Sequence, residues 1–230
     1  MPKQVLITGG AGNLGKATVD EFINEGYNVI ATVSPGKGSE YTSTQQIEYR
    51  EADLTNELKS AELVADVIAK YRQLDAAILL VGGFDMGGVE KTDGLLLKKM
   101  FALNFDTAWN IARPAFLQMK TQPTGGRIVL VGSRPSLDAN AGKDMMAYGL
   151  SKSLLFKLAE YLNAEGRSKN IVTSVIVPST IDTPENRSSM PKADFSKWVT
   201  PAAIAKNIAY LCSDEGTILR EPILKLYGDA

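Results

Sequence analysis

The sequence predicts a single α/β domain over residues 1–230, built on a doubly wound parallel sheet of about seven strands. Two observations predict it. Short apolar segments of strand length alternate with longer segments of helical periodicity, the pattern of parallel strands joined by right-handed crossover helices. The first strand segment is also followed at once by a glycine-rich loop and a helix. We expect strands at 5–7, 27–33, 47–49, 76–81, 127–131, 171–177 and 223–227, and helices at 16–25, 56–71, 93–120, 148–164 and 202–212.

The composition narrows the classes of function. The chain has 230 residues, 44% of them hydrophobic, which suits one domain with a substantial core. Its 25 Lys and Arg against 26 Asp and Glu leave no basic excess for nucleic acid, so we expect a small-molecule partner. Histidine is absent, which excludes Ser-His and Cys-His catalysis and imidazole metal ligands, and we expect no metal. Any acid/base catalysis must therefore use Tyr, Lys, Asp or Glu side chains.

A second set of features predicts where the protein resides. Residues 1–3 lead directly into a strand, and no apolar run reaches the ~18 residues of a membrane span. Cys212 is the single cysteine and cannot form an internal disulfide. We therefore expect a cytoplasmic protein that does not enter a membrane.

The glycine-rich loop predicts dinucleotide binding. Gly10, Gly12 and Gly15 fit the spacing G-x-G-x-x-G between a strand and a helix. Glycines there permit a tight turn and a close backbone approach, and the helix N-terminus presents free N–H groups to a pyrophosphate. The alternative, a merely structural turn, has less support because both flanking elements are present.

The end of the second strand bears on the choice of cofactor. An acid that would bind the adenosine ribose is expected there and is missing. Residues 34–39 instead form a Gly/Ser/Pro loop with no room for a regular helix before the strand at 47–49. Ser34 could hydrogen-bond a 2′-phosphate and Lys37 could approach it, so either NADPH or NADH is expected, with NADPH slightly favoured.

Four further features bear on the site or on the helices around it. Asp53 either meets the adenine or starts a helix capped by Thr55 or Asn56, and these are compatible. The helix 56–71 is expected to turn Leu58, Ala61, Ala65 and Ile68 inward.

The glycine-dense loop 82–88 follows a strand and is expected to line the site. Asn104 and Pro114 both disturb the helix 93–120, although an Asn there is usually only a surface residue.

A tyrosine and a lysine mark the start of the helix 148–164. Tyr148 and Lys152 are four residues apart and share one helix face. A nearby ammonium favours the phenolate, so Lys152 is expected to lower the pKa of Tyr148 and make it an acid/base device. The same pair alone could be a packed Tyr beside a solvated Lys.

Taken in order, these segments resemble the short-chain dehydrogenase/reductase family along nearly the whole chain. The resemblance is carried by TGGAGNLG at 8–15, Asn104, Ser133, YGLSK at 148–152 and PSTIDT at 178–183. It implies a Rossmann-type fold and an NAD(P)H-dependent oxidoreductase. Tyr148 would donate a proton and Ser133 would orient the substrate oxygen. Lys152 would hold the nicotinamide ribose and lower the pKa of Tyr148, and Asn104 would support a water relay to Lys152.

The cofactor-binding residues are expected in four parts of the chain. They are Gly9, Gly12, Asn13, Leu14 and Gly15; Ser34 and Lys37; Asp53, Leu54 and Gly82; and Tyr148, Lys152, Pro178, Ile181 and Thr183. The resemblance also implies a homodimer or homotetramer in which the helices 93–120 and 148–164 pack against their mates.

A closer resemblance, to dihydropteridine reductases, covers LVGGF at 80–84 and the segment 178–198. It implies a substrate lid at about 179–199, with Phe84, Met145, Met190 and Trp198 at the substrate. Those reductases carry an acid where Ser34 stands and lack a serine at the place of Ser133. We therefore predict reduction of a carbonyl or quinonoid imine, with Tyr148 as proton donor. The alternatives are a dihydropteridine reductase proper and a non-catalytic dinucleotide-binding redox sensor.

Overall fold

A single sheet organises the molecule. The computed structural model describes residues 2–229, so Met1 and Ala230, the outermost residues of the predicted domain, lie outside it. The described residues form a sheet of seven parallel strands in the order β3-β2-β1-β4-β5-β6-β7, which confirms the predicted fold class. The strands are β1 (Gln4–Thr8), β2 (Asn28–Val33), β3 (Ile47–Glu51), β4 (Ala76–Leu79), β5 (Gly126–Val131), β6 (Ile171–Pro178) and β7 (Ile223–Leu226).

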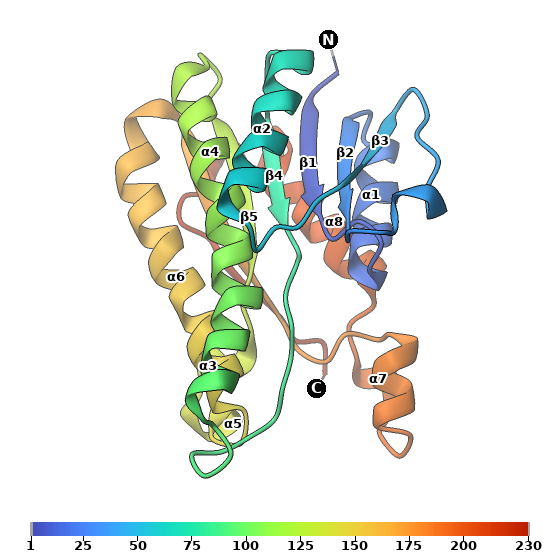
Figure 1. Ribbon diagram of the computed structural model, residues 1–230, viewed down its shortest axis with the longest axis vertical. Coiled ribbons are helices and arrows are strands. Elements are labelled where there is room, and N and C mark those ends of the chain that lie inside the picture. Colours follow the sequence, from blue (N-terminus) through green and yellow to red (C-terminus); the bar gives the residue numbers. More distant parts are fainter. Residues whose placement is uncertain (1, 230) are drawn as a thin grey trace.

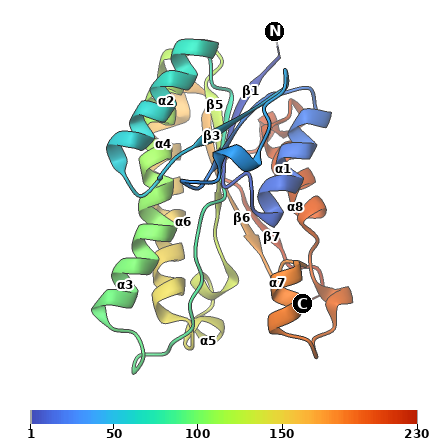
Figure 2. The same cartoon turned by 45° about the vertical axis from the view of Figure 1, so that its right-hand side comes forward.

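Helices cover both faces of this sheet (Figures 1 and 2). One face carries α1 (Asn13–Asn24) and α8 (Pro201–Cys212), and the other carries α2 (Glu57–Tyr71), α4 (Thr107–Thr121) and α6 (Met146–Gly166). The alternation along β1 shows how the sequence builds this arrangement. Leu6 packs into one buried cluster while Val5 and Ile7 pack into the other, because successive strand side chains point to opposite faces.

The predicted inward face of α2 is confirmed at Ile68, which packs against the core, and is wrong at Leu58 and Ala65. Leu58 is 75% exposed and Ala65 is also exposed, whereas the buried apolar side chains are Leu63, Val64 and Val67. The two alternatives are overlapping helical registers of the same sequence. The observed one places leucine and valine side chains against the sheet in place of two alanines, and so buries more apolar area.

The predicted helix 93–120 is continuous but not uniform. It begins as α3 (Gly94–Phe101), passes through a π-helical segment (Ala102–Asp106) and continues as α4. The π-helical segment contains Asn104, which confirms that helical hydrogen bonding is disturbed there. Such segments often coincide with functional sites. Three short elements, α3, α5 (Ala139–Gly142) and α7 (Pro184–Ser189), project beyond the carboxyl edge of the sheet (Figure 1).

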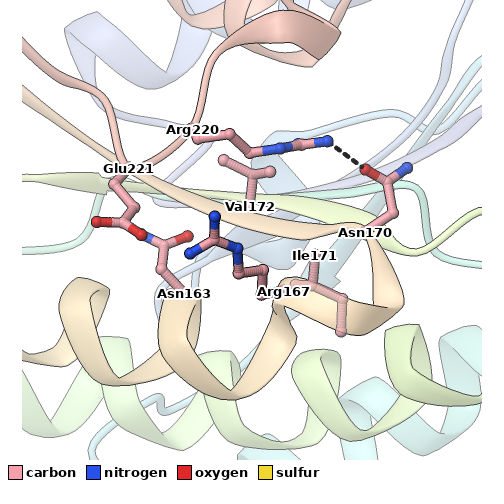
Figure 3. A pocket seen from close by; sticks show the side chains of 7 residues that line it. All are labelled: Asn163, Arg167, Asn170, Ile171, Val172, Arg220 and Glu221. Carbon is pink, nitrogen blue, oxygen red and sulfur yellow. Dashed lines mark hydrogen bonds between the residues drawn. The ribbon is translucent and has the colours of Figure 1, made fainter.

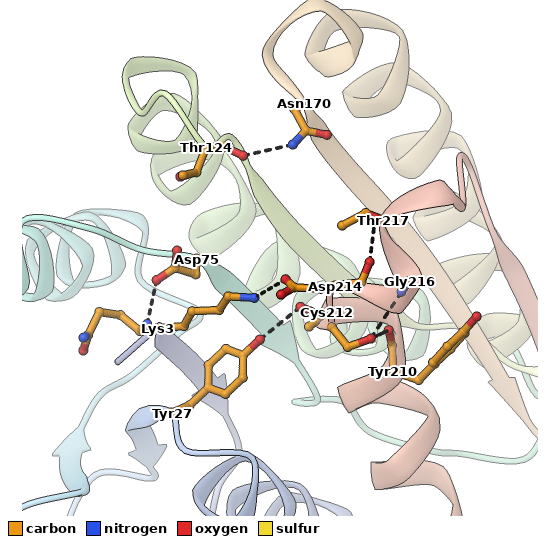
Figure 4. Close-up of polar contacts among 12 residues, drawn as sticks. Lys3, Tyr27, Asp75, Thr124, Asn170, Tyr210, Cys212, Asp214, Gly216 and Thr217 are labelled. Atoms are coloured by element: carbon orange, nitrogen blue, oxygen red, sulfur yellow. Dashed lines mark hydrogen bonds and ion pairs between the residues drawn. The ribbon is translucent and has the colours of Figure 1, made fainter. Parts of the chain in front are cut away.

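The opposite, amino edge of the sheet is joined by polar contacts between distant segments (Figure 4). Lys3 forms an ion pair of 2.7 Å with Asp214, just beyond α8. The Tyr27 hydroxyl donates to the Cys212 carbonyl at 3.0 Å, and burial raises the pKa of this phenol. The Asp75 carboxylate accepts from the backbone N–H of Gln4 at 2.7 Å. The first two contacts hold the end of α8 beside the starts of β1 and β2, and the third holds the segment before β4 beside β1.

Candidate functional site

Four loops meet at the carboxyl edge of the sheet. They follow β1, β4, β5 and β6, and most of the predicted site residues lie on or beside them, whereas Ser34 and Lys37 follow β2 and Asp53 and Leu54 follow β3. In open parallel sheets, ligands bind at this edge and near the point where the strand order reverses. In this chain the order reverses between β1 and β4, so the loops after these two strands flank the expected crevice.

The glycine loop has the geometry of a phosphate cradle. Gly9 adopts the left-handed region with φ 69°, and a Cβ added at Gly15 would lie 2.0 Å from the Gly9 carbonyl oxygen. Gly12 is the N-cap of α1, and no side chain among residues 2–229 caps that helix start. Among the described residues, the first-turn N–H groups of α1 therefore have no side-chain cap as acceptor. This donor set fits a pyrophosphate.

Asn104 is fully buried and ties three elements together. Its side-chain oxygen accepts from the Gly83 N–H at 3.0 Å, and its side-chain nitrogen donates to the Gly83 carbonyl and to Ser151 Oγ, each at 3.0 Å. A Cβ added at Gly82 would lie 2.6 Å from Asn104 Oδ1 and 3.1 Å from Lys152 Nζ. Only glycine fits there, so Gly82, Asn104 and Lys152 are brought together. Ser151 was missed by sequence reasoning; its place one residue before Lys152 was the available signal.

Lys152 is buried and lies one turn after Tyr148 in α6. Its Nζ donates to the Val131 carbonyl at 2.8 Å, at the end of β5. Burial lowers the pKa of Lys152 to about 8, because the ammonium loses hydration. The expected effect of Lys152 on Tyr148 is wrong in this structure. Burial raises the pKa of Tyr148, and the group that opposes this rise is the hydrogen-bonded Ser133 hydroxyl.

Ser133 is buried and is held by a second serine. The Ser136 hydroxyl donates to the Ser133 carbonyl at 2.5 Å and lies 3.1 Å from the Ser133 hydroxyl, while the Ser133 N–H donates to Ser136 Oγ at 3.3 Å. This reciprocal arrangement is a capping box at a short helical turn. Sequence reasoning missed Ser136, although Ser-x-x-Ser with an intervening proline was the signal.

The structure settles one of the two interpretations at the adenine end. Asn56 is the N-cap of α2 and accepts from the Lys59 N–H at 3.1 Å. Asp53 accepts from the Thr55 hydroxyl at 2.6 Å and from its N–H at 3.1 Å, and these bonds lower the pKa of Asp53. Leu54 is buried. Asp53 therefore forms a local turn and stays partly exposed toward the crevice.

The segment 179–199 is anchored at both ends. Ile181 and Val199 pair through a backbone bridge, and Thr183 is the N-cap of α7, accepting from the Asn186 N–H at 3.2 Å. Arg187 binds both carboxylate oxygens of Asp182, at 2.5 and 2.8 Å. Pro178, at the end of β6, is buried. Pro178, Ile181 and Thr183 therefore follow one another from the carboxyl end of β6 to the start of α7.

The four expected substrate residues have different surroundings. The ring of Phe84 is 58% exposed and contacts Tyr148 edge-to-face, with centroids 5.1 Å apart. Met145 pairs with Gly87, which joins the loops before α3 and α6. Trp198 packs on Phe195 within the segment 179–199, with ring centroids 4.8 Å apart, and Met190 is 40% exposed. The structure therefore brings Phe84 to the tyrosine.

A small hollow lies at the amino edge of the sheet, away from the predicted site residues. It lies between the end of α6, the start of β6 and the turn before β7, and Arg220 donates there to Asn170 at 3.3 Å (Figure 3). Its volume is about 50 Å³, well below that of ordinary small-molecule sites. The residues that the sequence singles out all lie at the other edge.

Within residues 2–229, we find no cluster of three or more Cys, Asp or Glu side chains placed to hold a metal ion. No helix in this range combines the length and the apolar character that crossing a membrane requires.

The fold is a doubly wound α/β sheet, and the site brings the buried Asn104 and Lys152 together beside Gly82 at its carboxyl edge. Residues 3–194 match the family described as short chain dehydrogenase, and the chain belongs to that family. It is an oxidoreductase of this family. The predicted family is thereby confirmed.

Known relatives differ in what their names describe. The dihydropteridine reductase of Dictyostelium discoideum is 28% identical over 90% of this chain and 87% of its own. The cyclic-di-GMP-binding biofilm dispersal mediator protein of Escherichia coli K12 is 27% identical over 94% of this chain and 92% of its own. The solved structure described as "ElxO with NADP Bound" has a TM-score of 0.90 at 23% identity, covering 99% of this chain and 98% of that one. That likeness shows the shared fold.

Proposed function

We propose that the protein reduces a carbonyl or a quinonoid imine with NADPH or NADH, and that Tyr148 donates the proton. The observation that carries this proposal is the interaction of the Ser133 hydroxyl with the Tyr148 phenol, which lowers the pKa of the phenol against the rise that burial causes. A serine and a phenol in contact offer two O–H groups to one substrate oxygen.

The chain's own residues fit the proposed cofactor along the crevice. Gly9, Gly12 and Gly15 present backbone without side chains of their own beside the start of α1, where the pyrophosphate would bind, and Asn13 and Leu14 lie in its first turn. Asp53 and Leu54 would flank the adenine. Gly82, Lys152, Pro178, Ile181 and Thr183 would hold the nicotinamide end. Bound NAD(P)H would supply the hydride.

The ionisation of the site suits proton donation. Because burial raises the pKa of Tyr148, the phenol keeps its proton at neutral pH and is available as an acid. Ser133, clamped by Ser136, orients the substrate oxygen toward it. Lys152 donates to the Val131 carbonyl at the end of β5 and has a pKa of about 8, so it can exchange a proton near neutral pH, and its proposed part is to return a proton toward Tyr148. Asn104 would support this relay as a positioning residue through Gly82 and Gly83.

The exposed aromatic ring of Phe84 beside Tyr148 suggests which class of substrate the site accepts. Its exposed ring lies edge-on against Tyr148, so a flat, conjugated substrate could stack beside the phenol. Quinones, quinonoid dihydropterins and aryl ketones share this shape. The dihydropteridine reductase relative supports the second of these as the alternative substrate. The test is absorbance at 340 nm, screened over carbonyls, quinones and dihydropterins with each cofactor.

A non-catalytic dinucleotide sensor is the rival function. The relative named for binding cyclic-di-GMP favours it, since that name describes binding. The same screen separates the two. Turnover of any of these substrates at a rate abolished by changing Tyr148 excludes a pure sensor, whereas nucleotide binding without turnover across the screen favours it.

We further propose a homodimer or homotetramer. Large apolar side chains stay exposed along two adjacent helices of one face, with Trp109 36% and Leu117 47% exposed on α4, and Leu150 48% and Tyr161 68% exposed on α6. Exposed apolar side chains gathered over two helices are typical of a protein interface. A second copy of the chain is the partner that the predicted assembly implies.

The cytoplasmic location of the protein stays a prediction.

A further inference from the structure

The loop after β2 is occupied by a carboxylate from the neighbouring strand. Glu51 ends β3 and pairs in register with Val33, the last residue of β2. One carboxylate oxygen accepts from the Gly36 N–H, and the other accepts from the Gly38 N–H at 3.1 Å. Glu51 therefore lies on the loop 34–39, where a 2′-phosphate of NADPH was expected to bind.

Two glycines of the loop 34–39, Gly36 and Gly38, leave room for the Glu51 carboxylate and direct N–H groups at it. A Cβ added at Gly38 would lie 2.6 Å from a Glu51 carboxylate oxygen, so a side chain there would push the carboxylate away. Gly36 has φ 79°, a conformation that favours glycine and turns its N–H toward Glu51. Successive backbone N–H groups in such turns form concave anion sites. Here the chain's own anion fills that position.

The cation expected to bind a phosphate is also engaged. Lys37 Nζ lies 2.5 Å from Glu40 Oε1, and this contact raises the pKa of Lys37. An open hollow of about 360 Å³ lies beside the loop, with Pro35, Ala52 and Leu63 among its lining residues. Its charged lining consists of four carboxylates and two cations: Glu51, Asp53, Glu62, Asp66, Arg50 and Lys59. A doubly charged anion entering here meets more negative than positive charge.

We propose that Glu51 is a specificity-determining residue for the cofactor. Its carboxylate oxygens keep lone pairs that can accept from the adenosine ribose hydroxyls, and its charge opposes a 2′-phosphate. Glu51 thus takes the place of the acid that is missing at the end of β2, from the adjacent strand. The inference rests on the proposed use of NAD(P)H. Ser34 and Lys37 favour NADPH and Glu51 opposes it, so the net preference is narrow.

The test measures binding, so it needs no substrate. ADP-ribose and 2′-phospho-ADP-ribose are titrated calorimetrically into the wild-type chain and into Glu51→Gln and Glu51→Ala. We expect the ratio of the two dissociation constants to shift at least about tenfold toward the phosphorylated ligand in both variants. Because the ratio cancels any loss common to both ligands, a loosened loop does not imitate this result.

The matched control is Glu62→Gln, which removes one negative charge from the same hollow without a contact to the loop N–H groups. It should shift the ratio less than about threefold. If Glu51→Gln shifts the ratio no more than Glu62→Gln does while the wild-type chain binds ADP-ribose, the inference is wrong and the proposed function stands. If the wild-type chain binds neither ligand, both are wrong.

Discussion

The Asn13 side chain donates a hydrogen bond of 2.7 Å to the Glu185 carboxylate, across 172 residues of sequence. Asn13 begins α1 beside the glycine loop, and Glu185 lies in the first turn of α7 in the segment 179–199 (Figure 2). The expected lid is thus tied to the expected phosphate cradle by one exposed polar contact. An exposed contact of this kind stabilises by about 1 kcal/mol or less, so it can open readily.

We predict that Glu185→Ala loosens the segment 179–199. Hydrogen exchange of its backbone amides should speed up severalfold, because Asn13 no longer holds α7. Ser188→Ala, on the exposed side of the same helix, is the control and should leave exchange unchanged. Saturating NAD(P)H should slow exchange in the wild-type segment if it acts as a lid. Equal exchange with and without the cofactor would count against a lid.

Tyr148→Phe should keep the fold and cofactor affinity but lose turnover by about 10²-fold or more. This is the usual scale for a positioned proton donor, and the substitution removes only the hydroxyl that contacts Ser133. Tyr161→Phe, on the exposed side of the same helix, is the matched control and should retain full activity. The measurements are steady-state kcat and fluorescence titration of the cofactor. Normal turnover by Tyr148→Phe would end the assignment of Tyr148 as proton donor.

All seven strands and the long helices between them follow from the sequence because local periodicity and glycine placement determine them, whereas the short helices α5 and α7 were not predicted. Asn104 is an example within a helix: a polar residue in an apolar helical run predicted the disturbance that the π-helical segment shows. The glycine loop is another, since a Cβ at Gly15 cannot fit. These features depend on residues close together in the chain.

The rest depends on contacts between distant segments. Nothing near Lys152 in sequence indicates that its ammonium binds the Val131 carbonyl, and nothing in the loop 34–39 indicates the Glu51 carboxylate. The predicted effect of Lys152 on Tyr148 failed for this reason: the sequence gives the spacing on the helix, but burial by other elements sets the pKa values. The register of α2 failed because two apolar stripes overlap and the sheet selects one.

The exposed apolar face of α4 and α6 predicts self-association at micromolar concentration. Light scattering should give a multiple of the chain mass of 24.8 kDa. Leu117→Asp combined with Tyr161→Asp should yield monomers, because two charges would be buried without partners in the interface. Ile218→Asp, 83% exposed after α8, is the control and should not change the mass. A monomeric wild-type chain would contradict the proposed assembly.

The last prediction concerns the pH dependence of stability at Lys152. Its pKa is about 8 in the folded chain against 10.5 for an ordinary lysine, so the unfolded chain binds more protons between these two values. Stability from this site therefore rises with pH across the window from about 8 to 10.5, and below pH 8 the buried charge costs the most.

In Lys152→Met, which keeps the length of the side chain without its charge, that rise should be absent. The free energy of unfolding of the variant minus that of the wild-type chain should fall by about 3 kcal/mol or less over this window. Urea unfolding followed by circular dichroism at several pH values measures it, with Lys157→Met, an exposed lysine on the same helix, as control. A difference that stays constant with pH would show that Lys152 is not a desolvated ammonium and would remove the basis for its proposed part in the proton relay.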